Sequence, residues 1–152
     1  MSAFKKFLYR VYRLRWVVTR PVTLGVRLLL IKEGQVVLVK PSYQDGWYFP
    51  GGGVKRNETL EQTARREAKE ELGADLGKLG LFGIYDLFYE SKNDHIVLFQ
   101  CGDFTYTGKF DFEIERVQAF PLRALPADIA PGHERRIKEY LEGRKELRFG
   151  YW

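Results

Sequence analysis

The chain has 152 residues and a mass of 17.8 kDa, which suits one domain. Its 45% hydrophobic and 30% charged residues are typical of a globular protein and too apolar for an intrinsically disordered chain. Its net charge is +5, and its single cysteine, Cys101, excludes an internal disulfide and a cysteine-based zinc site. The lack of a disulfide framework favours a cytoplasmic location.

The positive charge is concentrated in residues 1–20, which hold six bases and no acid, whereas residues 21–152 hold 19 bases and 20 acids. A neutral body argues against nucleic-acid binding by the whole domain. Apolar residues recur at helical spacing between the bases and predict an amphipathic helix. These residues are Phe4, Phe7, Leu8, Val11 and Tyr12. We expect this helix to pack on the domain or on a second copy of it, with contact to a membrane surface or to RNA as the alternative.

A strand-rich globular domain is expected over residues 21–143. Val22–Ile31 and Gln35–Lys40 are rich in β-branched and apolar residues and predict a hairpin that turns at Glu33-Gly34. Further strands are expected over residues 81–89, 95–101 and 117–120, and a last helix over residues 133–141. Residues 144–152 end in Phe149, Tyr151 and Trp152, for which the sequence offers no obvious core, so we expect an aromatic tail there.

The clearest helix covers residues 59–72. Thr59 and Gln62 fit a capping box, in which each side chain pairs with the backbone N–H of the other residue. Gly73 stands where a left-handed C-terminal cap belongs. The sequence therefore predicts both ends of this helix.

The helical phase aims two carboxylates at the side that the helix buries. With Leu60 at 0° and about 100° per residue, Ala64 and Ala68 share its face, and Glu67 and Glu71 lie within about 20° of it. Glu70 falls on the flank. Like charges at this spacing repel each other, and part-buried carboxylates need a positive partner.

Two groups could supply this positive charge, namely Arg66 and a bound divalent cation. Three carboxylates on neighbouring turns form a hard, oxygen-only site that suits Mg²⁺ or Mn²⁺ rather than zinc. The alternative is a charge-rich helix that faces water. The inward phase of Glu67 and Glu71 favours the cation site.

A run of three glycines, Gly51, Gly52 and Gly53, precedes the helix. Glycine permits positive φ and close approach of the backbone to a ligand, and the following helix N-terminus favours phosphate. A glycine triplet alone is more often a turn. Followed closely by a carboxylate face, it predicts a combined phosphate and metal site.

Residues 52–74 resemble the Nudix box, the signature of the Nudix hydrolase (MutT-like) superfamily. The pattern is a Gly, five residues, a Glu, seven residues, then Arg-Glu, an apolar residue, any residue, Glu-Glu, any residue, Gly and an apolar residue. Here it begins at Gly52, continues with Glu58 and ends with the run Arg66 to Ala74 (REAKEELGA). Every fixed position matches. Asn57 stands where many members have Gly, and Asn tolerates a left-handed turn position.

The resemblance implies an α/β fold, an α/β/α sandwich with a central mixed β-sheet on which the box helix packs. It implies a metal-dependent hydrolase of a nucleoside diphosphate linked to another moiety, such as a nucleotide sugar, a dinucleoside polyphosphate or a nucleoside triphosphate. An enzyme on RNA 5′ ends and a non-catalytic nucleotide-binding module are the alternatives. A homodimer and contact with a membrane surface stay open.

By motif position, the resemblance implies that Glu67, Glu70 and Glu71 bind Mg²⁺ or Mn²⁺, with the Gly51 carbonyl as a further ligand. It also implies that Arg66 orients a box glutamate, either Glu58 or Glu67. The general base stays open within the trio or on a later loop, where Glu113 and Glu115 are the best candidates.

Two further residues are candidates for substrate binding, together with the three glycines of the loop. Arg27 lies on an otherwise apolar strand, where a buried guanidinium needs an anionic partner such as a substrate phosphate. Tyr89 is a candidate for stacking on a nucleobase, although aromatic residues beside strands mostly belong to the core.

Overall fold

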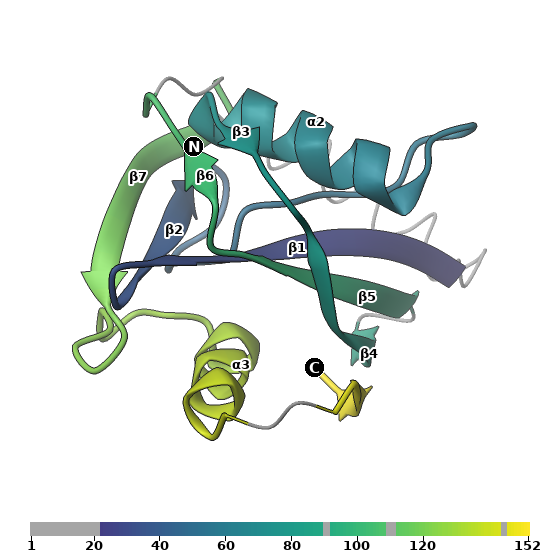
Figure 1. The fold of residues 1–152 in the computed structure, drawn as a ribbon. Helices are drawn as coiled ribbons and strands as arrows, with labels where there is room; N and C mark the ends of the chain where they lie inside the picture. Colours follow the sequence, from purple (N-terminus) through teal and green to yellow (C-terminus); the bar gives the residue numbers. More distant parts are fainter. Residues whose placement is uncertain (1–21, 90–91, 109–111, 144–145) are drawn as a thin grey trace.

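A mixed sheet forms the centre of the computed structural model, which describes residues 22–89, 92–108, 112–143 and 146–152. Its six strands are β1 (Val22–Lys32), β2 (Gln35–Pro41), β4 (Gly80–Tyr89), β5 (Lys92–Cys101), β7 (Ile114–Pro121) and β8 (Arg148–Tyr151). They lie in the order β7-β2-β1-β5-β4-β8 (Figure 1). The pairs β1–β5 and β4–β8 are parallel and the other pairs are antiparallel. The helix expected over residues 1–20 lies outside the described residues.

The first two strands form the predicted hairpin. Ile31 pairs with Val36, and the two turn residues, Glu33 and Gly34, have φ values of 52° and 73°. Two consecutive positive φ angles match the right-handed twist of the strands, and Gly34 adopts this conformation without steric cost. A smaller sheet pairs β3 (Asp75–Leu76) with β6 (Phe104–Thr105), neither of which we predicted.

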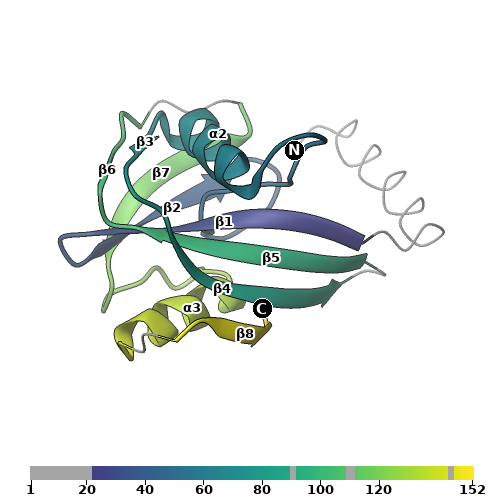
Figure 2. The ribbon, with the colours of Figure 1, turned by 45° about the vertical axis from the view of Figure 1, so that its right-hand side comes forward.

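Two helices cover opposite faces of the sheet, α2 (Leu60–Leu72) and α3 (Pro131–Leu141), as Figures 1 and 2 show. Alternate residues of β1 point to the two sides, so that Val26 and Leu28 join the core under α2 while Leu29 joins the core under α3. The predicted α/β/α sandwich with a mixed sheet is therefore confirmed. Neither of these two helices has the length and apolar character needed to cross a membrane.

Both predicted ends of α2 are confirmed. The Thr59 hydroxyl accepts a hydrogen bond from the Gln62 N–H at 3.1 Å, and the Gln62 side chain accepts one from the Thr59 N–H at 2.8 Å. Gly73 has φ 61° and donates its N–H to carbonyl groups of the last turn. Because the ends are fixed, the phase of the helix against β1 is fixed too.

The prediction that the C-terminal aromatic residues have no core to join is wrong for Trp152. Strand β8 extends the sheet beside β4, and the Trp152 ring is buried against Tyr85 and His133 at centroid distances of 5.6 and 4.9 Å. Phe149 and Tyr151 are exposed. No sequence pattern indicated this, because β8 is a short edge strand and its buried residue follows directly after it.

Replacing Trp152 with alanine should lower the free energy of unfolding by about 3–5 kcal/mol, because a large ring leaves a cavity between β4 and α3. Phe112→Ala is the matched control, since Phe112 is 80% exposed. Urea unfolding at constant pH measures both. Equal stability of the two variants would show that Trp152 contributes nothing to the core.

Candidate active site

The glycine loop lies along β1 as an additional, irregular strand. The Leu28 N–H donates to the Pro50 carbonyl and the Val26 N–H to the Gly52 carbonyl, both at 2.9 Å. Gly51 has φ 135°, and a Cβ atom there would overlap the Val26 carbonyl. The loop therefore needs glycine at this position in order to approach β1 so closely.

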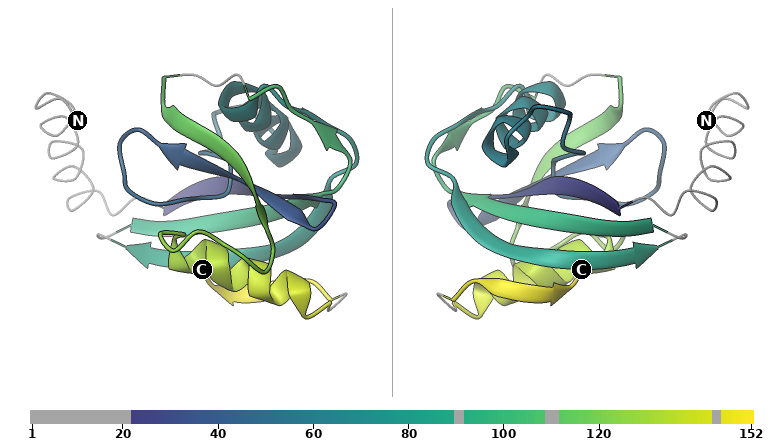
Figure 3. Two further views of the ribbon diagram at one scale, coloured as in Figure 1. Left: turned by 90° about the vertical axis from the view of Figure 1, so that its left-hand side faces the viewer. Right: turned by 90° about the vertical axis from the view of Figure 1, so that its right-hand side faces the viewer.

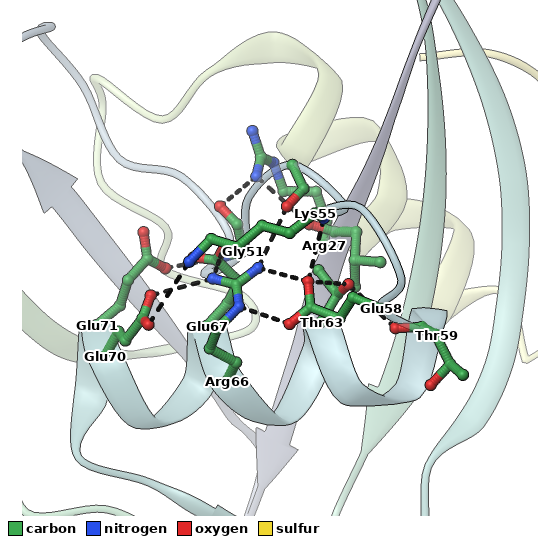
Figure 4. A network of polar contacts seen from close by, with 12 residues as sticks. Arg27, Gly51, Lys55, Glu58, Thr59, Thr63, Arg66, Glu67, Glu70 and Glu71 are labelled. Carbon is green, nitrogen blue, oxygen red and sulfur yellow. Dashed lines mark hydrogen bonds and ion pairs between the residues drawn. The ribbon is translucent and has the colours of Figure 1, made fainter.

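The two inward carboxylates of α2 meet this loop, as the helical phase predicts. Glu71 Oε2 accepts a hydrogen bond from the Gly51 N–H at 2.7 Å. The Glu67 carboxylate lies so close to Gly52 that a Cβ atom at Gly52 would overlap it. Figure 4 shows both side chains rising from α2 toward Gly51. The loop and the helix thus form one structural unit.

Arg66 supplies positive charge beside the carboxylates of Glu58, Glu67 and Glu70. Its Nε and Nη2 donate to the two carboxylate oxygens of Glu58 at 2.7 and 2.9 Å, a bidentate pair. Its Nη1 donates to Glu67 at 2.5 Å and to Glu70 at 3.0 Å (Figure 4). The expected pairing with Glu58 or Glu67 therefore involves both residues.

Burial makes these contacts strong. The side chains of Glu58, Arg66 and Glu67 are 14%, 18% and 12% exposed. Hydrogen bonds from Arg66 lower the pKa of Glu58 to about 2, helped by the Lys55 N–H and the Thr63 hydroxyl. The hydrogen bond to Glu58 is also the largest cause that raises the pKa of Arg66, so both groups are ionised across the neutral range.

Glu70 lies on the flank of α2, where the helical phase placed it. Its side chain is 43% exposed and shares Nη1 of Arg66 with Glu67. Lys55 Nζ lies 3.9 Å from its other oxygen. Glu67 and Glu70 therefore converge on a single positively charged nitrogen.

The donor set fits a hard divalent cation in its chemistry, because Glu67, Glu70 and Glu71 supply only oxygen atoms. Within the described ranges no group of three or more His, Cys, Asp or Glu side chains is arranged to hold a metal ion. The three α2 carboxylates instead have protein partners. Arg66 donates to Glu67 and Glu70, and the Gly51 N–H donates to Glu71.

Arg27 reaches the same loop from β1. Its Nη1 donates to the Gly51 carbonyl, the group expected as a further metal ligand. Arg27 also lies within electrostatic reach of Tyr43, as do Glu71 and Glu113. Burial is the main cause that raises the pKa of Tyr43; these glutamates add to it, whereas Arg27 opposes it. Arg27 and Glu113, which are 86 positions apart in the sequence, thus lie near the same tyrosine.

Sequence reasoning missed Tyr43 and His133. Tyr43 lies in a polar loop that has no pattern of its own. His133 is buried in α3 and accepts a hydrogen bond from the Phe49 N–H at 3.0 Å, directly before the glycine loop. Burial lowers the pKa of His133 well below 6.5, with Arg27 and Arg136 as further causes, so the ring is neutral. The sequence indicated only that His133 begins a predicted helix, and this does not predict its contact with the glycine loop.

Tyr89 ends β4, where its backbone pairs with Lys92. Its side chain lies outside the described part of the molecule, so stacking on a base stays a prediction. Glu115 lies on β7 and has an exposed side chain 3.9 Å from Arg116.

The family of the chain follows from a comparison with protein families. Residues 19–140 match the NUDIX domain. The chain belongs to the NUDIX family. A crystal structure of a MutT NUDIX hydrolase from Burkholderia pseudomallei superposes with a TM-score of 0.71 at 21% identity, covering 78% of this chain and 97% of that one, which shows a shared fold.

Among curated relatives, an RNA pyrophosphohydrolase from Hydrogenovibrio crunogenus is 43% identical over 56 residues, 37% of this chain and 34% of that protein. A putative mutator protein MutT4 from Mycobacterium tuberculosis is 32% identical over 101 residues, 61% of this chain and 40% of that protein. The chain thus spans well under half the length of these two relatives.

The Glu58–Arg66 ion pair should make the free energy of unfolding depend on pH in the acidic range. Folding lowers the pKa of Glu58 from 4.5 to about 2. As the pH falls, the Glu58 carboxylate is therefore protonated in the unfolded chain before it is protonated in the folded one, which favours unfolding. The stability advantage of wild type over Glu58→Gln should be complete above about pH 4.5 and shrink toward about pH 2. Urea unfolding across this range measures it. An advantage that is constant with pH would contradict the ion pair, and Glu61→Gln, at an exposed pair with Arg65, is the control.

Proposed function

We propose that this NUDIX protein is a divalent-metal-dependent hydrolase that cleaves the diphosphate link of a small nucleotide derivative. The observation that carries the proposal is the attachment of Glu67 and Glu71 to the glycine loop, with Arg66 beside them. This arrangement brings carboxylates, backbone amides and guanidinium groups to one place. Phosphoryl chemistry needs these groups, because negative charge must be stabilised while water is deprotonated.

Glu67, Glu70 and Glu71, with the Gly51 carbonyl, are the residues that would hold Mg²⁺ or Mn²⁺. When bound, such an ion neutralises phosphate charge and lowers the pKa of water. The trio supplies up to three negative charges in a part-buried setting, which favours a small, doubly charged cation over a monovalent one.

The protein's own groups divide the remaining work. Arg27 lies beside the loop and is suited to bind a phosphate oxygen, since its Nη1 donates to the uncharged carbonyl groups of Val26 and Gly51. Arg66 holds Glu58, Glu67 and Glu70 in place. Glu113, which like Glu71 lies within electrostatic reach of Tyr43, is the candidate outside the helix for accepting a proton from water.

The substrate class is proposed as a small nucleotide, as the neutral charge of residues 21–152 favours. RNA 5′ ends are the second candidate, because the curated relative from Hydrogenovibrio crunogenus carries the name RNA pyrophosphohydrolase. Binding to RNA through phosphates would weaken steeply with added salt, which distinguishes the two. A cytoplasmic location and a homodimer stay predictions.

Glu70→Gln should lower turnover at least about a hundredfold, because it removes one negative charge and one metal ligand. The melting temperature should change little, since Glu70 is on the exposed flank. The assay is a panel of nucleotide sugars, dinucleoside polyphosphates, nucleoside triphosphates and triphosphorylated RNA with Mg²⁺ or Mn²⁺, with products identified by mass spectrometry.

Glu61→Gln is the matched control on the same helix and should retain the wild-type rate. Glu113→Gln should lower kcat with little change in KM if Glu113 accepts the proton. Full activity of Glu70→Gln would overturn the proposed metal site. No cleavage of any substrate by wild type would favour a binding module instead.

A further inference from the structure

Part of the sheet face that carries α2 exposes apolar side chains in the described part of the molecule. Six side chains share it, with exposed fractions between 37% and 74%, and we call them the open face. They are Val22, Leu24, Ile84, Phe88, Phe149 and Tyr151. Exposed apolar patches of this kind mark interaction sites.

Strand register shows that these side chains form one surface. Leu24 pairs with His95, His95 with Asp86, and Asp86 with Tyr151, so that these four residues form one row across β1, β5, β4 and β8. The neighbouring rows contain Ile84 beside Phe149, and Val22 on the same row as Phe88. Paired residues point to the same side of a sheet.

The open face continues the core that α2 covers. Val22 and Leu24 alternate in phase with Val26 and Leu28, which are buried under the helix. The helix α2 packs mainly on β1 and β3 and does not extend to β8. Figures 2 and 3 show β8 at the edge of the sheet, away from α2.

We propose that residues 1–20 of the same chain dock on the open face as an amphipathic helix. This segment directly precedes Pro21 and Val22, and Val22 itself belongs to the open face. Residues 19–21, if extended, span about 10 Å, which is the separation of packed layers, so the segment can turn back over the sheet.

The dimensions of the two surfaces agree. Four strands, β1, β5, β4 and β8, span about 14 Å between the outer strand axes. A helix with its apolar stripe between Phe4 and Val18 is about 20 Å long at 1.5 Å per residue. The stripe therefore crosses all four strands.

The charges favour this occupant over a membrane. The middle row of the open face contains Asp86, which lies 2.7 Å from His95. With Phe4 at 0° and about 100° per residue, Arg15 falls at about 20°, inside the apolar stripe, while Lys6, Arg10 and Arg13 lie on the other side. Docking of the stripe would therefore bring one base onto the face that contains Asp86. An anionic lipid surface would instead repel Asp86.

Tryptic cleavage within residues 1–20, followed by mass spectrometry of the full chain, tests the docking. The chain offers two matched pairs of substitutions. Val11→Asp changes the stripe and Val17→Asp the opposite helix side, at about 340° and 220°. Leu24→Asp changes the open face, whereas Leu141→Asp changes an equally exposed leucine at the end of α3, the exposed fractions being 42% and 47%.

We expect Val11→Asp and Leu24→Asp to speed cleavage at least tenfold, and Val17→Asp and Leu141→Asp to leave it near the wild-type rate. The same rate in all four variants would overturn the proposal. Protection that rises with protein concentration would identify a second copy as the occupant. Protection that appears only with anionic phospholipid vesicles would identify a membrane surface, and each of these two results also contradicts docking within one chain.

Because aspartate at Leu24 can disturb β1, thermal unfolding of each variant is recorded first. If Leu24→Asp does not fold, Phe149→Asp takes its place, since Phe149 is 74% exposed on the edge strand β8. Exchanging the charges of Arg15 and Asp86 gives an independent test. Arg15→Glu should speed tryptic cleavage at the other bases of residues 1–20, and adding Asp86→Arg should restore protection at these sites only if residues 15 and 86 meet.

Discussion

The site depends on one arginine placed among three carboxylates. Arg66 uses three nitrogen atoms to bind Glu58, Glu67 and Glu70, which would otherwise repel each other. Glu67 is thereby fixed against the glycine loop, and Glu71 is fixed by the Gly51 N–H. The rotation of α2 about its axis, the conformation of the glycine loop and the balance of charges therefore depend on one another.

The opposite side of the loop is held by the core under α3. Neutral His133 accepts from the Phe49 N–H, and its ring contacts Phe49 and Trp152 at centroid distances of 4.7 and 4.9 Å. Trp152 reaches this place because β8 pairs with β4. The residues that shape the loop thus come from both ends of the described chain.

The sequence was sufficient for features that local chemistry determines. The hairpin turn, the capping box, the inward phase of Glu67 and Glu71 and the αL conformation of Asn57, with φ 64°, each follow from a few neighbouring residues. Contacts between segments that are distant in the sequence could not be predicted from neighbouring residues. Trp152, Tyr43 and His133 carry no local pattern, and their roles depend on which strands become neighbours. The pairing of Arg27 with the Gly51 carbonyl is of this kind too, because it joins β1 to the loop.

Calorimetric titration of Mn²⁺ tests most directly whether the α2 carboxylates form a cation site. We predict that the wild-type chain binds Mn²⁺ and that Glu67→Gln weakens this binding at least about tenfold, while Glu61→Gln leaves it unchanged. Equal Mn²⁺ affinity of wild type and Glu67→Gln, or no binding by wild type, would contradict the account.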